Sequence, residues 1–185
     1  MVTNQSPYAF LPQEGLVGEL TRLLPFNESN ITSSYISWLN DPLVVRFSNQ
    51  RFKHHSKESC LEYLGSFQGT DNLFISISSL SGEQFIGTMT VYTVKQHSTA
   101  DIGILIGNKN IWGKGYGLDA LKTLINWLIS NCNIRKITAG TLSENIGMKT
   151  IFERSGMYKE GSRISQELVE GMPMDLIYFA RFRND

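Results

Sequence analysis

Apolar residues follow different periods in different segments of the chain, and each period predicts a kind of element. Residues 73–79 and 85–94 alternate or are rich in β-branched residues, with the turn signal Ser81-Gly82 between them, which predicts two antiparallel strands. Residues 99–106 end in the apolar run IGILI and predict a third strand. Gly87 indicates a bulge or a close backbone contact within the second strand.

A helical period begins shortly after the third strand. Apolar side chains recur at steps of three and four from Leu118 to Leu128, which is the stripe of an amphipathic helix. Residues 135–140 then predict a short strand, which should lie parallel to strand 99–106 because a crossover helix precedes it. The other predicted elements are a first strand at 15–24, helices at 30–40, 56–68 and 145–155, and a terminal hairpin within 158–182.

Length and composition restrict the classes of protein that remain. At 185 residues we expect one domain over residues 15–185, after a leader at residues 1–14. Lys and Arg number 17, as do Asp and Glu, and a net charge of zero argues against a nucleic-acid groove. Without an 18-residue apolar run or a signal-peptide pattern, we expect a cytoplasmic protein that has no membrane partner. The three His and two Cys residues lack ligand spacing, so no metal is expected.

Glycines join strand 99–106 to the helix that follows it. A strand that leads into a helix through glycines exposes backbone N–H groups at the positive end of the helix dipole, which suits phosphate. Gly113, Gly115 and Gly117 alternate, and this spacing fits neither the dinucleotide-binding fingerprint nor the P-loop. The loop alone therefore leaves a purely structural role open.

Four motifs in order indicate a family. Asn110–Gly115 (NIWGKG) resembles the pattern Q/R-x-x-G-x-G/A, and Trp112–Leu121 resembles W-G-x-G-Y-A-x-E-A-L. Trp38–Pro42 fits W-x-N-D-P, and Glu144–Met157 resembles E-N-x-x-S followed by E-K-x-G-F. Over residues 15–182 the chain resembles the GNAT-superfamily N-acetyltransferases, specifically the Rim-type branch that acetylates ribosomal-protein N-termini and many other amines.

This resemblance implies a fold and a cosubstrate. The GNAT acyl-CoA N-acyltransferase fold is an α/β (α+β) architecture with a mostly antiparallel seven-stranded sheet, a central parallel pair that splays apart, and about four helices. Acetyl-CoA would be the donor, with its pantetheine arm pairing in the gap like an added strand and its pyrophosphate on the glycine loop. The implied cofactor-binding residues are Ile104, Leu105, Ile106, Asn110, Ile111, Trp112, Gly113, Lys114, Gly115, Tyr116, Gly117 and Asn145. Asn145 has a second interpretation as a simple helix cap.

Acetyl transfer to an amine favours a base, because an alkylammonium with a pKa near ~10 is about a thousandfold protonated at pH 7. The candidate is Asp101, which shares a strand face with Gly103 and stands where the Rim branch often has an acidic residue. The alternative is an exposed strand carboxylate. A backbone N–H of Ile104 or Leu105 near a strand bulge is expected to stabilise the oxyanion. Tyr158 is the candidate acid for the leaving thiolate, against a structural tyrosine.

Three positions depart from the family pattern. Asn110 stands where Gln or Arg is usual, Met148 where the Rim branch has Ser, and Phe152 where other branches carry a proton-donating Tyr. The last two departures support a rival hypothesis, a catalytically inactive CoA-binding module. A dinucleotide-binding protein would instead need a parallel sheet that begins at the N-terminus, whereas the strands before the loop are predicted to be antiparallel.

The acceptor is predicted only as a class, a protein N-terminus or a small-molecule amine such as an amino sugar. Residues 44–55 carry several basic side chains and are either a solvated loop or a flap over the acceptor site. Direct transfer in a ternary complex is expected, because neither Cys nor Ser sits in a nucleophile motif. We expect a monomer or homodimer. The candidate acceptor-binding residues are Tyr35, Trp38, Asn40 and Arg46, and Tyr35 and Trp38 have packing in the core as their alternative interpretation.

Overall fold

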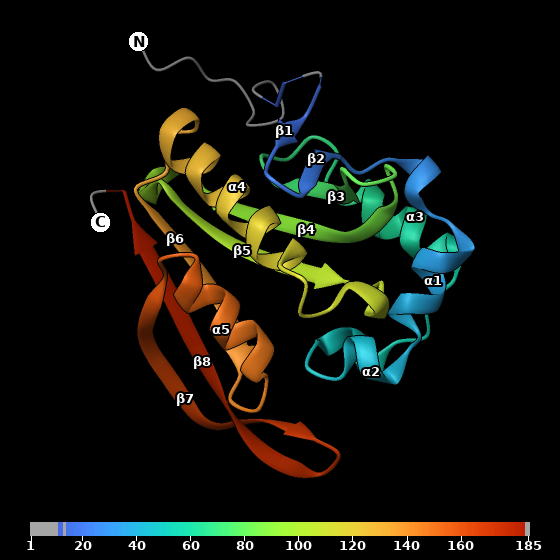
Figure 1. The fold of residues 1–185 in the computed structure, drawn as a ribbon. Coiled ribbons are helices and arrows are strands. Elements are labelled where there is room, and N and C mark those ends of the chain that lie inside the picture. Colours follow the sequence, from blue (N-terminus) through green and yellow to red (C-terminus); the bar gives the residue numbers. More distant parts are fainter. Residues whose placement is uncertain (1–10, 13, 184–185) are drawn as a thin grey trace.

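In the computed structural model, which describes residues 11–12 and 14–183, eight strands form one mixed sheet (Figure 1). Their order across the sheet is β1-β2-β3-β4-β5-β6-β8-β7, and of the pairs in that order β5 and β6 alone run parallel. The expected mixed, mostly antiparallel sheet with a central parallel pair is therefore confirmed. The strands are β1 (Leu16–Val17), β2 (Thr21–Pro25), β3 (Leu73–Ser79), β4 (Phe85–Val94), β5 (Thr99–Ile106), β6 (Lys136–Leu142), β7 (Tyr158–Val169) and β8 (Met172–Phe182).

The sheet has eight strands instead of seven because the predicted first strand at 15–24 is a hairpin. The N–H of Gly18 donates to the carbonyl of Thr21 at 2.8 Å, which turns the chain between β1 and β2. The continuous apolar pattern of this segment gave no sign of the turn. The predicted leader, residues 1–14, lies mostly outside the described residues.

Helices cover both faces of the sheet (Figure 1). On one face α4 and α5 pack over the central strands around Leu121, Leu124 and Phe152. On the other, α1 and α3 close a second, aromatic core around Phe74. Because both faces are covered, Phe74 and Ser76 of β3 are buried along with the apolar residues that alternate with them. The helices are α1 (Ser33–Leu39), α2 (Pro42–Val45), α3 (Lys57–Gly65), α4 (Tyr116–Asn131) and α5 (Ile146–Arg154).

Proline at position 42 begins a helix as well as following one. Asp41 caps α2 by accepting a hydrogen bond from the N–H of Leu43 at 2.9 Å, and Pro42 occupies the first helical position, where its missing N–H costs nothing. The segment 44–55, for which a solvated loop and a flap were the two predicted alternatives, contains the end of α2 and a 3-10 turn at Asn49–Phe52. None of the helices in the described part of the chain is long and apolar enough to cross a membrane.

Strands β5 and β6 are hydrogen-bonded to each other over only a short length. Thr99, Ala100 and Asp101 pair with Lys136 to Thr138, but β5 continues to Ile106 and β6 to Leu142 without further pairing between them. Beyond Asp101 the two strands therefore diverge, and the expected splayed pair is present. A β-bulge between β3 and β4 at Ile77/Ser78 lies opposite Gly87.

Substitution of Gly87 tests the tight contact beside this gap. A Cβ at Gly87 would lie 2.2 Å from the carbonyl oxygen of Leu105, which is backbone and cannot move aside easily. We expect Gly87→Ala to lower the free energy of unfolding by about 2 kcal/mol, measured by urea denaturation. Gly161→Ala, where a Cβ meets nothing within 4 Å, is the matched control and should unfold like the parent protein. Equal stability of the two variants would contradict the contact.

Candidate active site

The direction of the peptide groups along β5 follows from a few hydrogen bonds. The N–H of Gly107 donates to Ile86 of β4 at 3.0 Å, and the carbonyl of Ser98 accepts from Arg135 beside β6 at 2.8 Å. Peptide groups alternate in direction along an antiparallel strand, and the register between β4 and β5 is unbroken. The N–H and C=O groups of odd-numbered β5 residues therefore point toward β4, and those of even-numbered β5 residues point toward β6. Once pairing with β6 ends, the C=O of Ile102 and the N–H and C=O groups of Ile104 and Ile106 face the gap.

The opposite edge of the gap is formed by β6. The N–H of Ser143 donates to the carbonyl of Asp175 at 2.9 Å, so odd-numbered residues of β6 bond to β8. The peptide groups of Gly140 therefore point back toward β5. Unpaired donors and acceptors on both edges are what an extended chain with amides needs in order to insert.

The strand geometry changes two expectations. The register between β4 and β5 is continuous from Thr99 to Ile106, so the bulge expected in β5 is absent, and the irregularity lies between β3 and β4. Of the two candidate oxyanion donors, Ile104 directs its N–H into the gap, whereas Leu105 directs its peptide groups toward β4. The side chain of Leu105 packs in the aromatic core.

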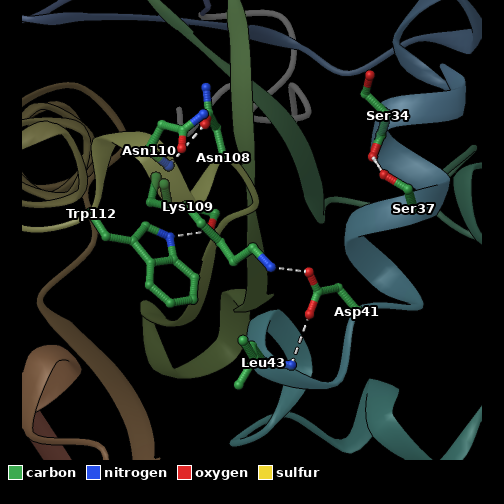
Figure 2. Close-up of polar contacts among 9 residues, drawn as sticks. Ser34, Ser37, Asp41, Leu43, Asn108, Lys109, Asn110 and Trp112 are labelled. Atoms are coloured by element: carbon green, nitrogen blue, oxygen red, sulfur yellow. Dashed lines mark hydrogen bonds and ion pairs between the residues drawn. The ribbon is translucent and has the colours of Figure 1, made fainter.

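Trp112 fastens the glycine loop to the end of β5. Its indole N–H, whose hydrogen bond is dashed in Figure 2, donates to the carbonyl of Ile106 at 2.8 Å, while 46% of the residue stays exposed. The carbonyl of Ile106 is therefore already engaged. Of the predicted arm-binding backbone, Ile104 and the N–H of Ile106 remain available in the gap.

The N–H groups of the loop divide into two sets. Four of the predicted phosphate-binding residues already bond within the loop, with acceptors on Asn108, Lys109 and Ile111. The free donors begin at the first loop glycine and continue into the first turn of α4, and no acceptor in the described chain pairs with them. The internally bonded residues are Asn110, Ile111, Trp112 and Lys114, and the free N–H groups belong to Gly113, Gly115, Tyr116, Gly117 and Leu118.

The three glycines have different reasons to be glycine. Gly113 and Gly115 adopt φ values of +76° and +91°, which side chains disfavour, and Gly115 is the N-cap residue of α4. At Gly117 a Cβ would approach Ile151 to 3.3 Å and Ile106 to 3.5 Å. Its missing side chain allows α4 to pack closely on β5 and α5, while its N–H still faces outward from the first helical turn.

The loop is also tied to the segment between α1 and α2 (Figure 2). Lys109 forms an ion pair with Asp41 at 2.5 Å, and this contact lowers the pKa of the Asp41 carboxyl. The ring of Trp38 lies where a Cβ on Gly107 would sit, 2.1 Å away. The W-x-N-D-P segment therefore braces the end of β5 at the point where the loop begins.

Asp101 lies at the last paired position before the strands diverge. Its carboxylate accepts a hydrogen bond of 2.6 Å from the hydroxyl of Thr138, directly opposite on β6. Part of the side chain reaches solvent, but desolvation by surrounding protein atoms raises the pKa of the Asp101 carboxyl, and the Thr138 hydrogen bond opposes this shift. A carboxylate with a raised pKa at the mouth of a gap is suited to accepting a proton at neutral pH.

A family model described as an acetyltransferase (GNAT) domain matches residues 21–158. The chain belongs to the GNAT acetyltransferase family. Among curated proteins, the probable N-acetyltransferase YjcK of Bacillus subtilis is 26% identical over 120 residues, which are 64% of this chain and 66% of that protein. The aligned segment thus spans about two thirds of that relative.

Solved structures confirm the GNAT fold. The spermidine N-acetyltransferase of Vibrio cholerae, in complex with CoA and spermine, superposes with a TM-score of 0.78 at 15% identity, covering 89% of this chain and 96% of that one. RimL, a ribosomal L7/L12 alpha-N-protein acetyltransferase in complex with CoA, gives a TM-score of 0.78 at 16% identity, covering 90% and 96%. At these identities the likeness concerns the fold.

Within this GNAT fold, Asn145 is compatible with both predicted roles. Its side-chain oxygen caps α5 by accepting from the N–H of Met148 at 3.2 Å. Its side-chain NH₂ group has no partner in the part of the chain that the structure describes, so it is free to donate. The cap and the proposed contact to a cofactor use different atoms and do not compete.

Tyr158 is not brought together with Asp101. In the register, Asp101 pairs with Thr138, Thr138 with Ala180, and Ala180 with Tyr158. Three strand spacings, about 14 Å, therefore separate the two backbones. Tyr158 stacks on Phe182 with 6.2 Å between ring centroids, which favours the structural alternative for this residue.

The four candidate acceptor residues have different surroundings. Tyr35 is 3% exposed within the aromatic core, where burial raises the pKa of its hydroxyl, and Trp38 packs on Phe85 and against Gly107. The amide of Asn40 bonds to the backbone of His55 in both directions, at 2.8 and 2.9 Å. Tyr35 thus cannot contact an acceptor in this structure.

Arg46 and Asn40 do border a pocket of about 620 Å³. One wall comes from residues 39–54 and the other from Leu168 to Glu170, at the tip of the β7–β8 hairpin. The segment 44–55 therefore lines a cavity together with the hairpin, and its role as a flap over the acceptor stays a prediction.

Asp119 in the first turn of α4 was not identified from the sequence as a site residue. Its carboxylate accepts from the N–H groups of Glu19 and Leu20 at 2.9 and 3.1 Å and from the hydroxyl of Thr21 at 2.6 Å. The β1–β2 turn is thereby fixed beside the loop, with Leu20 at 3.5 Å from a Cβ built on Gly115. The only sign of this role in the sequence is that Asp119 occupies the acidic position of the motif W-G-x-G-Y-A-x-E-A-L.

Removal of the Asp119 carboxylate should loosen the loop. We expect Asp119→Ala to lose about 2 kcal/mol of folding free energy, because three donors lose a charged acceptor, and to weaken CoA binding several-fold. Asp119→Asn, which keeps one acceptor oxygen, should lie between Ala and the parent. Urea denaturation and calorimetric titration with CoA measure both effects. Lys122→Ala, one turn along α4 and exposed, is the control; unchanged CoA affinity in Asp119→Ala would contradict this role.

Gly115→Val tests the glycine loop as the anion site. A β-branched residue at φ +91° forces the loop to rearrange its free N–H groups, so we expect CoA binding to be undetectable by calorimetric titration. Gly69→Val is the matched control, since Gly69 has φ +70° and open space around it far from the loop in sequence. CoA affinity at the parent value in Gly115→Val would rule out this loop.

Proposed function

We propose that the protein is an acetyl-CoA-dependent N-acetyltransferase that moves an acetyl group to a primary amine by direct transfer within a ternary complex. The observation that carries this proposal is Asp101. Its raised pKa and its position at the apex of the gap supply a base where the two substrates would meet. The acceptor is a protein N-terminus or a small-molecule amine.

The residues present fit acetyl-CoA, which would supply an activated thioester. Five free N–H groups at Gly113 and Gly115 through Leu118 form a cradle for a diphosphate at a helix N-terminus. The C=O of Ile104, the N–H of Ile106 and the peptide groups of Gly140 offer pairing in the gap to the amides of an extended arm. Asn145 adds a side-chain donor at the start of α5. Lys114 is exposed and adds little beyond long-range charge.

The chain's own groups then carry out the proton transfer and charge stabilisation. Asp101 takes a proton from the acceptor ammonium, directly or through water, so that the neutral nitrogen can attack. The N–H of Ile104 points into the gap, where it donates to a substrate carbonyl oxygen as negative charge develops. As the N–C bond forms and the C–S bond breaks, the attacking nitrogen gives up its second proton to the departing thiolate or to solvent, and the proton held by Asp101 leaves to solvent.

Proteins of the same fold support the proposed donor and the proposed class of acceptor. Two of them are described in complex with CoA, and their names give spermidine and the N-terminus of ribosomal L7/L12 as acceptors. Both acceptors present a primary amine. The transfer of these properties to the present chain rests on the free loop donors and on Asp101.

Thermal-shift measurements and an amine panel test the proposal. We expect acetyl-CoA and CoA to raise the melting temperature and NAD to leave it unchanged, and we expect thiol release only when an acceptor amine is added. Stabilisation by CoA without turnover on a panel of N-terminal peptides, amino sugars and polyamines would favour the inactive CoA-binding module instead.

The pH dependence of kcat tests Asp101. Because a general base must be deprotonated and the pKa of Asp101 is raised, kcat should fall as the pH decreases through a value above the usual Asp range. Thr138→Val removes a hydrogen bond to the carboxylate, which raises that pKa further and moves the acidic limb to higher pH.

Asp101→Asn should lower kcat by at least about a hundredfold with CoA affinity intact. The variant should be no less stable at pH 7, because a raised pKa means that folding disfavours the charged form of Asp101 at that pH. A parent-like pH profile in Asp101→Asn would remove Asp101 from the role of base.

A further inference from the structure

The pocket beside the proposed acceptor site has an uneven distribution of charge. Arg46, Arg51, Lys53 and His54 line one wall, whereas Glu170 is the acidic residue among those that line it. The remaining surface is largely apolar, from side chains such as Leu39, Val45 and Leu168. A cavity of this kind suits a ligand with an apolar body and an anionic group, and it disfavours a polycation.

Arg51 has a structural role in this wall. Its guanidinium pairs with Glu167 at 3.3 Å and donates to the carbonyl of Leu168 at 3.1 Å, and the two side chains are only 13% and 20% exposed. This pair is shielded from solvent and holds the hairpin tip against the 3-10 turn at Asn49–Phe52. Arg51 is therefore committed to the hairpin and is not free to bind a ligand.

Arg46 is engaged far more loosely. It lies 3.5 Å from Glu170, and the side chains are 46% and 74% exposed, so the ion pair contributes little to stability and exchanges easily. The side chain of Lys53 has neither an ion-pair nor a hydrogen-bond partner among the residues that the structure describes. The weakly held guanidinium of Arg46 and the unpaired ammonium of Lys53 thus belong to residues that line the same cavity.

The pocket lies close to the carboxyl end of β5. Trp38, which contacts Gly107 beyond that end, directly precedes the pocket-lining Leu39 and Asn40. Three residues of extended strand, about 10 Å, separate Gly107 from Ile104 in the gap. An acceptor that occupies the pocket while its amine reaches the gap is therefore extended.

We propose that this pocket binds a carboxylate or phosphate on the acceptor through Arg46 and Lys53, while the acceptor's amine reaches the gap across the roughly 10 Å of strand between Gly107 and Ile104. Glu170 pairs with Arg46 when no acceptor is bound and is displaced by the acceptor's anion. The inference rests on the proposed function and specifies the substrate class of the same site. The anion belongs either to a peptide with an acidic residue about three positions from its N-terminus or to an elongated small acid.

Matched acceptor pairs distinguish these sources. The peptide arm compares Ser-Ala-Ala-Glu-amide with Ser-Ala-Ala-Gln-amide, and the small-molecule arm compares a long-chain ω-aminocarboxylate with its amide, by thiol release from acetyl-CoA. We expect the anionic member of at least one pair to have a kcat/KM about tenfold higher than its neutral partner, which corresponds to ~1.4 kcal/mol. The arm that shows the preference identifies the source of the anion.

Three variants with opposite expected effects separate recognition from folding. Arg46→Gln and Lys53→Gln should each raise KM for the anionic acceptor about threefold to tenfold and leave KM for the neutral one unchanged. Glu170→Gln should lower KM for the anionic acceptor, because a competitor for Arg46 is removed. A general loss of structure cannot produce this opposite sign. Lys122→Gln, an equal loss of charge on the far face of the sheet, should leave both KM values unchanged.

The possible failures are distinguishable. Turnover of neutral and anionic acceptors with equal kcat/KM in both arms, or an increase in KM for the anionic acceptor in Glu170→Gln, overturns the anion inference while acetyl transfer stands. If no amine supports thiol release although CoA binds, the proposed function fails, and this inference fails with it.

Discussion

The site depends on the length over which β5 and β6 are paired. Three positions of parallel ladder hold the strands together, and beyond Asp101 and Thr138 the ladder ends. Backbone groups that a longer ladder would have satisfied are left on both edges of the gap, where they are available to a ligand. Helices α4 and α5 cover one face of the sheet, and α1 and α3 lie on the other (Figure 1). The gap interrupts a ladder that is otherwise continuous from β1 to β7.

Contacts from distant parts of the chain hold the glycine loop in position. Lys109 binds Asp41 near α1, Trp112 binds the end of β5, and Asp119 binds the β1–β2 turn. Four loop N–H groups are used internally, which leaves the outward-facing set at the start of α4 fixed in direction. Donors that are preorganised in this way bind an anion with little further loss of conformational entropy.

The sequence predicted the elements and the site loop better than the individual site atoms. Periodicity and the ordered motifs gave the strand–loop–helix unit, the parallel pair and the family. They could not show that Gly18 splits the first strand, that the side chain of Asp119 fixes the β1–β2 turn, or that Tyr158 lies three strands from Asp101. Each of these depends on strand order or on packing between segments remote in sequence, which a local pattern does not encode.

The hydrogen bond between Asp101 and Thr138 has a consequence for how this chain can vary. The same ladder position ends the parallel pairing and holds the carboxylate, so a one-residue deletion before it in β5 would turn Asp101 onto the face covered by α4. Insertions and deletions in the segments that connect the strands are tolerable, because they leave this register intact. Insertions within β5 or β6 should therefore be selected against more strongly than insertions in the turn between β3 and β4, which lies outside the gap.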